Sequence, residues 1–337
     1  MTKKIELKTD VKIGVLATHL KFVGGLVPDE NGKLPRNEQG ELVIVAGIIR
    51  LKKVSPVKLS VVQLSYFPGL SEEDLMELVT KIRGTGLEIQ FVLMVGGADP
   101  MDPQDEDAVV EMLLVGIAAA KEHKISICSS TSIEEWMKTG AIPKEGADYR
   151  AAIAQNAKVH ARVFTEGRMA HSCVEEWHIE FLRSGEFQTF TNLQKAWDVV
   201  RALNESVGQP FFKVLIDTAH CGDSNLNIDE NIEIIHAIGE ANQLGIFHAS
   251  APTTRGCLST DDGWIGALLK ACSDTGKLKY VLVEIFHHED EALEPLRSLV
   301  EGHGVDSTDG RNYDELMLDG VVDITRRLNN LVARNIL

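Results

Sequence analysis

Residues 212–249, FKVLIDTAHCGDSNLNIDENIEIIHAIGEANQLGIFHA, contain two short apolar runs separated by a longer amphipathic segment. The runs Phe212–Asp217 and Gly245–Ala249 are rich in Val, Ile, Leu and Phe, which is typical of buried strands. Between them, Asp229 precedes a helical pattern over Glu230–Asn242. A strand, a helix and a second strand in this order predict a βαβ unit with parallel strands.

The same alternation extends over almost the whole chain. Eight short apolar runs predict strands, and they are Val11–Ala17, Leu59–Tyr66, Leu87–Val95, Ile125–Ser129, Trp177–Leu182, Phe212–Asp217, Gly245–Ala249 and Tyr280–Phe286. Eight strands that alternate with helices favour a closed (β/α)₈ TIM barrel over an open doubly wound sheet. No G-x-G-x-x-G motif follows the first run, so a dinucleotide-binding fold is not indicated.

The chain is predicted to form one domain over residues 1–337, because a barrel of roughly 250 residues with insertions fits this length. Insertions are expected at about 20–42 and 130–174. The second carries a helix longer than a barrel needs, which would cover the site or build an oligomer contact. Glu41–Val54 is compatible with either the first helix or a strand.

Polar residues mark the expected helix starts. Ser71 precedes an acidic first turn, Asn192 precedes a run to Ser206, and Asp262 precedes Trp264–Ser273. The last helix is expected from Asn312 to about Asn335.

Charge and cysteine content limit the partners and the compartment. The net charge is −16, from 34 basic and 50 acidic residues, and such a surface repels phosphate backbones. Five cysteines are an odd number without a C-x-x-C pair, which indicates free thiols in a cytoplasm. No apolar signal core or apolar run of roughly 18 residues is present. We therefore expect a cytoplasmic protein without nucleic acid or membrane partners, and the oligomeric state stays open.

Four consecutive predicted strands end in polar side chains: Glu180, Asp217, His248 and Glu284. The carboxyl ends of barrel strands converge on one rim, where the active sites of this fold lie. Carboxylates in apolar strands are costly unless they are paired or bind a metal. Three oxygen ligands and one imidazole suit one divalent ion, with Mn²⁺ as first choice and Mg²⁺, Co²⁺ or Zn²⁺ as alternatives.

Three motifs give the chain a resemblance to the xylose-isomerase-like superfamily of TIM barrels. EFLRSGE at 180–186 with Phe190-Thr191-Asn192 resembles the E-P-L-N-x-x-E…F-L-N-T segment, and LIDTAH at 215–220 resembles the L-D-T-x-H strand end. Phe247-His248 through Arg255 resembles a third, looser segment. The superfamily includes D-tagatose 3-epimerase, hydroxypyruvate isomerase and inosose dehydratase, and more distantly endonuclease IV.

The resemblance implies roles for individual residues. The positions of Glu180, Asp217, His248 and Glu284 ligate the metal in the epimerases. Glu186, His220 and Arg255 would then contact a sugar or acid-sugar substrate. The chain departs from the family pattern at two places: Ile285 stands where the family has proline, and His248-Ala249-Ser250-Ala251 lacks the family's acidic residue.

A metal-dependent carbohydrate isomerase or epimerase is the function that this site predicts. The ion would bind the substrate carbonyl and stabilise an enediolate. Glu180 and Glu284, on opposite sides of the ion, would be the catalytic acid–base groups. A lyase that dehydrates a keto-inositol or an acid sugar at the same site is the alternative, and a barrel that binds sugar without turnover is a third.

A nuclease of the endonuclease IV type is disfavoured by three departures. That enzyme uses three zinc ions and needs histidines at the ends of strands two and three, where this chain has Gln63–Tyr66 and Met94–Gly97. Its Asp-x-His pair is replaced by Thr260-Asp261-Asp262. The net charge of −16 points the same way.

Overall fold

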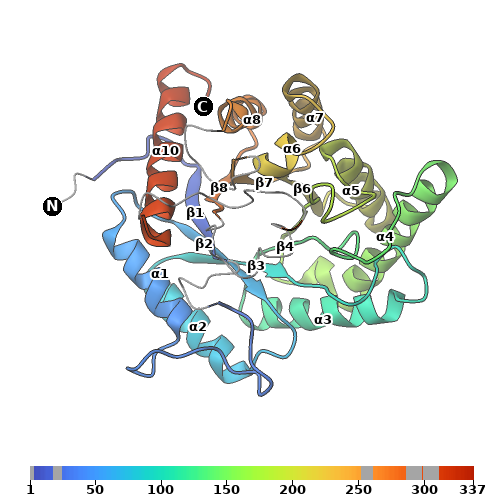
Figure 1. Cartoon of the computed structure of the whole chain (residues 1–337), viewed down its shortest axis with the longest axis horizontal. Coiled ribbons are helices and arrows are strands. Elements are labelled where there is room, and N and C mark those ends of the chain that lie inside the picture. Colours follow the sequence, from blue (N-terminus) through green and yellow to red (C-terminus); the bar gives the residue numbers. More distant parts are fainter. Residues whose placement is uncertain (1–3, 18–24, 252–260, 286–297, 299–310) are drawn as a thin grey trace.

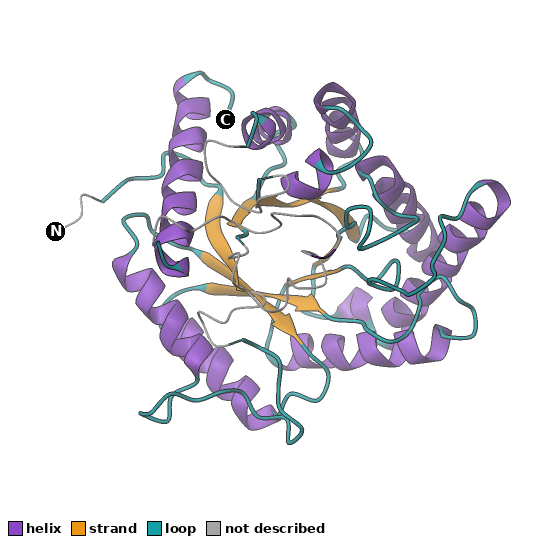
Figure 2. Cartoon of the chain, viewed as in Figure 1, coloured by secondary structure: helices purple, strands orange, loops and turns teal. Residues whose placement is uncertain are grey.

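Eight parallel strands close into a barrel in sequence order, β1 to β8, and β8 pairs with β1. Helices surround this barrel on its outside (Figure 1), and Figure 2 shows the ring of strands at the centre. The computed structural model describes residues 4–17, 25–251, 261–285, 298 and 311–337. The predicted single-domain TIM barrel is confirmed.

Each predicted apolar run overlaps one strand of the barrel. The strands are β1 Lys12–Ala17, β2 Val61–Tyr66, β3 Glu88–Leu93, β4 Ile127–Ser130, β5 Glu176–Ile179, β6 Phe212–Asp217, β7 Leu244–Ala249 and β8 Tyr280–Val283. Both faces of these strands are buried because one faces the barrel interior and the other faces the helices.

The helices connect consecutive strands. They are α1 Val43–Val54, α2 Glu72–Gly84, α3 Glu106–Glu122, α4 Gly146–Glu166, the 3₁₀ helix η1 Met169–His171, α5 Leu193–Val207, α6 Thr218–Gly222, α7 Ile228–Glu240, α8 Trp264–Asp274 and α10 Tyr313–Ala333. Segment Glu41–Val54 therefore contains the first helix, α1, which begins at Val43, and no strand; Leu42 forms only an isolated β-bridge with Arg36. None of the described helices has the length and apolar character that a membrane crossing requires.

The long helix expected in segment 130–174 is α4, the barrel helix between β4 and β5. It packs against both α3 and α5. Residues 18–24 of the other expected insertion lie outside the described residues. The insertion boundaries themselves remain predictions.

Three helix starts agree with the sequence prediction and two differ. Asn312 caps the last helix, α10, in a capping box with Glu315. Ser71 and Asn192 accept hydrogen bonds from backbone N–H groups of α2 and α5, as N-caps do. The cap of α7 is Asn227 rather than Asp229, because Asn227 forms a capping box with Glu230. The predicted cap of α8, Asp262, does not cap this helix with its side chain. Instead, the Asp261 carboxylate accepts hydrogen bonds from the backbone N–H groups of Gly263 and Ile265. Asp262 itself has a φ of +49°.

A small apolar layer fills the barrel below the site, and its members come from five strands: Val61, Ile127, Leu215, Ile246 and Leu282. Two positions further along the same strands, or directly beyond their ends, stand Gln63, Ser129, Asp217, His248 and Glu284. Side chains two apart on a strand face the same side. The polar side chains therefore point into the barrel, one layer closer to its C-terminal end than the apolar layer.

Ionic contacts close the opposite, N-terminal end of the barrel. Glu88 forms an ion pair with Lys12 and accepts a hydrogen bond of 2.8 Å from the Tyr280 hydroxyl. Glu176 lies 3.0 Å from both His178 Nε2 and Lys279 Nζ. The two ends of the barrel thus differ in chemistry: paired charges at the N-terminal end and converging carboxylates at the C-terminal end.

Gly14 on β1 marks a close approach between strands. A Cβ atom at this position would lie 2.2 Å from the Val61 carbonyl oxygen and 2.5 Å from Val61 Cγ1. We predict that Gly14→Ala lowers the free energy of unfolding by about 1–3 kcal/mol, because the barrel wall must shift to admit the methyl group. Urea denaturation measures this change.

The matched control is Gly84→Ala at the end of α2, where an added Cβ meets nothing within 4 Å. This variant should keep the wild-type urea midpoint or raise it slightly. Equal midpoints for the two variants would contradict the packing argument.

Candidate functional site

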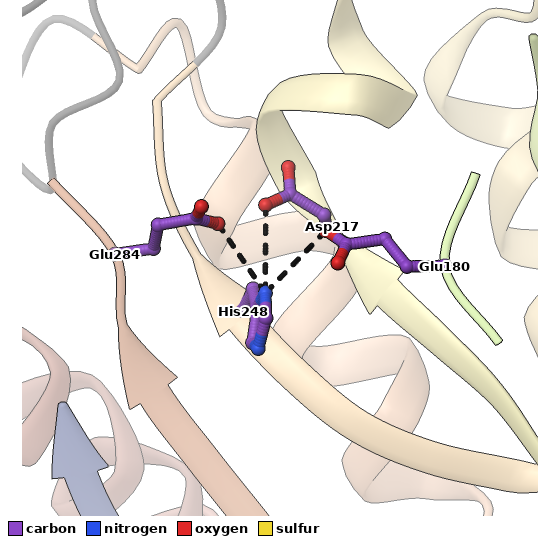
Figure 3. A group of neighbouring side chains, drawn as sticks. All are labelled: Glu180, Asp217, His248 and Glu284. Carbon is purple, nitrogen blue, oxygen red and sulfur yellow. Dashed lines mark ion pairs between the residues drawn. The ribbon is translucent and has the colours of Figure 1, made fainter. Parts of the chain in front are cut away.

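The four polar residues predicted at the ends of strands five to eight meet at one point. Asp217 is the last residue of β6 and His248 lies in β7, while Glu180 and Glu284 directly follow β5 and β8. All four are buried, and one ligand atom from each lies within 4.8 Å of the others. Figure 3 shows the two glutamates approaching His248 from opposite sides.

His248 Nδ1 is the centre of this cluster. It lies 3.3 Å from Glu284 Oε2, 3.6 Å from Glu180 Oε1 and 3.8 Å from Asp217 Oδ2. The other ring nitrogen, Nε2, lies 2.9 Å from Gln63 Oε1. Three carboxylate oxygens thus surround one nitrogen, Nδ1, of a single imidazole.

The local sequence explains how Asp217 is aimed. Its Oδ1 accepts a hydrogen bond of 2.8 Å from the backbone N–H of His220, which caps the short helix α6. At this strand-to-helix turn, D-T-A-H, the hydrogen bond to the backbone therefore holds Oδ1 in place, and the other oxygen, Oδ2, faces His248.

The electrostatics of the cluster are dominated by burial and by mutual attraction. Burial opposes ionisation of Glu180, but His220 and His248 hold the pKa of this carboxyl well below its usual range. Burial would likewise lower the pKa of His248, but the Glu180 and Glu284 carboxylates outweigh it and raise the pKa to about 10. The site therefore strongly favours a positive charge among its carboxylates.

The donor atoms fit a divalent cation. Although His248 Nδ1 and Glu284 Oε2 lie 3.3 Å apart, neither makes a hydrogen bond of acceptable geometry with any described residue. One ring proton cannot serve three carboxylates at distances of 3.3–3.8 Å. A cation between them would contact all four groups, and three oxygens with one imidazole suit a hard or borderline ion.

Two of the three predicted substrate-contacting residues can be placed. His220 Nε2 lies 3.5 Å from Glu180 Oε1, so this imidazole borders the cluster, and its ring packs against Phe181. Glu186 lies on the loop between β5 and α5, where its Oε1 accepts a hydrogen bond of 3.3 Å from Trp136 Nε1. Arg255 lies outside the described residues.

Glu134 organises the loop that carries Glu186, a role that no local sequence pattern indicates. Its buried carboxylate accepts hydrogen bonds of 2.8–3.1 Å from the backbone N–H groups of Gln188, Thr189 and Phe190. A further bond of 2.8 Å joins Met137 N to the Glu186 carbonyl. The β4–α4 and β5–α5 loops are thereby joined over the rim.

Gln63 is a second residue that sequence reasoning missed. The strand V-V-Q-L-S-Y places an amide among apolar side chains, and that irregularity was the available signal. Its partner His248 is 185 positions away in the chain, so no local pattern could identify it.

Comparisons with known proteins bear on the fold. No protein-family model matches the chain, and no curated protein matches it in sequence. Among solved structures, an L-ribulose 3-epimerase superimposes with a TM-score of 0.72 at 16% identity, covering 96% of this chain and 97% of that one. The chain has the fold of the ketose 3-epimerases.

Two further solved structures illustrate the breadth of this likeness. The D-psicose 3-epimerase of Clostridium cellulolyticum H10, solved with D-tagatose, gives a TM-score of 0.66 at 14% identity over 94% of this chain and 99% of that one. An AP endonuclease of family 2 from Brucella melitensis gives 0.55 at 11% identity over 81% and 92%. At these identities the likeness establishes the barrel alone, in agreement with the superfamily resemblance of the motifs.

The joined loops generate a prediction about stability. Glu134→Gln should lower the free energy of unfolding by about 1–3 kcal/mol, because an amide presents an N–H₂ group to backbone N–H donors that then stay unsatisfied. Thermal or urea unfolding measures the loss.

Glu135→Gln is the matched control, since among the described residues this neighbouring carboxylate makes a partly exposed ion pair of 3.4 Å with Lys138. It should unfold as the wild type does. A wild-type midpoint for Glu134→Gln would show that the carboxylate does not hold the loop.

Proposed function

We propose that the protein is a metal-dependent isomerase or epimerase of small sugars, of the ketose 3-epimerase type. The observation that carries this proposal is the buried convergence of Glu180, Asp217, His248 and Glu284, with the two glutamates on opposite sides (Figure 3). The shared fold of L-ribulose and D-psicose 3-epimerases supports it. The comparisons give no support to the lyase alternative.

The proposed chemistry is a proton transfer beside a carbonyl. A divalent ion bound by the four side chains would polarise the carbonyl and ease loss of a proton from the neighbouring carbon. Glu180 or Glu284 would accept the proton from one face as a carboxylate, and the other glutamate, protonated beforehand from solvent, would donate its proton to the opposite face. This inverts the configuration at that carbon, whereas transfer on one face between adjacent carbons gives an aldose–ketose isomer. Proton exchange with water after product release would restore both groups.

Neighbouring side chains would orient the substrate. His220, whose Nε2 lies 3.5 Å from Glu180 Oε1, would hold a sugar hydroxyl next to that carboxylate. Glu186 would bind a second hydroxyl from the loop fixed by Glu134 and Trp136. Arg255 completes the proposed set of substrate contacts.

The finer points of the proposal rest on chemistry and composition. Mn²⁺ suits the three oxygen donors and one imidazole, with Mg²⁺, Co²⁺ and Zn²⁺ as alternatives. The described cysteines Cys128, Cys173, Cys221 and Cys272 are free thiols, which supports a cytoplasmic location. The net charge of −16 supports a small-molecule substrate over nucleic acid, although an AP endonuclease shares the fold.

Metal binding is the first test. After dialysis against a chelator, the protein should bind one Mn²⁺ or Co²⁺ per chain in calorimetry, and its thermal midpoint should rise. An ion at 100 times its Kd stabilises the folded state by about 2.7 kcal/mol. Asp217→Asn should abolish the rise, because it keeps the oxygen that caps α6 but removes the charge.

Asp229→Asn is the control for this measurement, since Asp229 is exposed in the first turn of α7. It should retain the wild-type response to Mn²⁺. Unchanged binding in Asp217→Asn would remove this residue from the proposed ligand set.

Turnover is the second test. The Mn²⁺-loaded protein is incubated in D₂O with D-fructose, D-psicose, D-tagatose and L-ribulose, and the products are analysed by NMR and mass spectrometry. Epimerisation with one solvent deuteron at the inverted carbon is the expected result. Glu284→Gln should lower the rate by about 10²–10⁴-fold, since it removes an acid–base group.

Glu175→Gln is the control, because this exposed glutamate lies at the opposite end of β5 from Glu180. It should turn over at the wild-type rate. A product lighter by one water would establish the lyase instead, and full activity of Glu284→Gln would exclude the acid–base assignment.

A further inference from the structure

Gln63 is a buried amide in the interior of the barrel. It lies on β2 between Val62 and Leu64, and its side chain is fully shielded from solvent. A primary amide in such surroundings is costly unless both its oxygen and its nitrogen are hydrogen bonded. Both are.

The two halves of the amide contact two other strands. Gln63 Nε2 donates a hydrogen bond of 2.8 Å to Ser129 Oγ on β4. Gln63 Oε1 lies 2.9 Å from His248 Nε2 on β7. An amide oxygen can only accept, so the ring proton of a neutral His248 is on Nε2 and the lone pair is on Nδ1. With Ser129 Oγ accepting from the amide nitrogen, the amide oxygen is directed at His248.

The selected tautomer is the one that the candidate metal centre requires. Nδ1 is the nitrogen that faces Glu284, Glu180 and Asp217, at 3.3, 3.6 and 3.8 Å. A nitrogen binds a metal through its lone pair, and a hydrogen bond from the other ring nitrogen fixes both tautomer and ring orientation.

A neighbouring residue shows that burial of an amide does not by itself create such a contact. Gln90 on β3 is the register partner of Gln63 and is equally buried. Neither polar atom of its side chain hydrogen bonds to any described residue. Gln63 therefore differs from Gln90 in its hydrogen-bond partners and not in its burial.

We propose that Gln63 is a positioning residue that holds His248 with its Nδ1 lone pair toward the carboxylates, ready for the cation. The inference rests on the proposed metal centre and adds to it a residue from the far side of the barrel. Ser129 anchors Gln63, so the contact runs from β4 through β2 to β7.

The test compares the Co²⁺ affinity of metal-free variants, followed by visible absorption of the bound ion. Gln63→Leu removes the acceptor at similar volume and should weaken binding by about 10–100-fold. Gln63→Glu keeps an acceptor for the Nε2 proton and should bind within a few-fold of the wild type. Gln90→Leu, the matched control, should leave the affinity and spectrum unchanged.

A second measurement reports the ring directly. In ¹⁵N-histidine spectra of the metal-free wild type, His248 is identified by the signal lost in His248→Asn. At a pH where this ring is neutral, its proton should be on Nε2. Gln63→Leu should shift this ring toward a mixture of tautomers, and Ser129→Ala should do so in part. If Gln63→Leu does not fold, Ser129→Ala carries both measurements.

The outcomes separate this inference from the proposed function. Wild-type affinity in a folded Gln63→Leu, or in Ser129→Ala if the former does not fold, overturns the inference, as does an equal loss in Gln90→Leu. A wild-type protein that binds Co²⁺ but turns over no sugar overturns the epimerase proposal and leaves the role of Gln63 intact. A wild-type protein that binds no Co²⁺ overturns the metal centre and this inference together.

Discussion

Repulsion among buried carboxylates is the constraint on which the site depends. Glu180, Asp217 and Glu284 are brought within 4.8 Å of one another, and the layer beneath them is apolar. Like charges so close in a poorly hydrated interior destabilise the fold unless a positive charge lies between them. In the protein without metal, a protonated His248 can supply one positive charge. A divalent cation at the proposed centre would supply two and could contact all four groups.

The barrel makes this arrangement tolerable by separating its ends. Charges at the N-terminal end are paired directly, as in Glu88 with Lys12 and Glu176 with Lys279. At the C-terminal end, three carboxylates face a single imidazole, that of His248. Stability is thus provided at one end and binding capacity at the other, as is general for this fold.

Sequence reasoning succeeded where a feature repeats or ends a local pattern. The eight apolar runs gave the strands, and the strand ends gave Glu180, Asp217, His248 and Glu284, because all parallel strands deliver their C-terminal residues to one rim. The start of α7 was misplaced by two residues, since Asn227 and Asp229 are both good caps and only the capping box with Glu230 distinguishes them.

It failed where a role depends on partners distant in sequence. Gln63 and His248 are separated by 185 positions, and Glu134 and Phe190 by 56. Nothing in the local composition around Gln63 or Glu134 indicates these partners. The tertiary packing of strands and loops that are distant in sequence creates them.

The four converging side chains all come from β5 to β8, one contiguous half of the barrel. The loop that follows β3 contributes no member to this cluster within the described part of the chain. This loop can therefore change in length or composition, through evolution or engineering, while the cluster keeps its geometry. Under the proposed function, substrate preference can then vary on that half of the molecule while the proposed metal centre stays on the other. On the same half, β2 and β4 are restricted through Gln63 and Ser129, and the loop after β4 is restricted through Glu134.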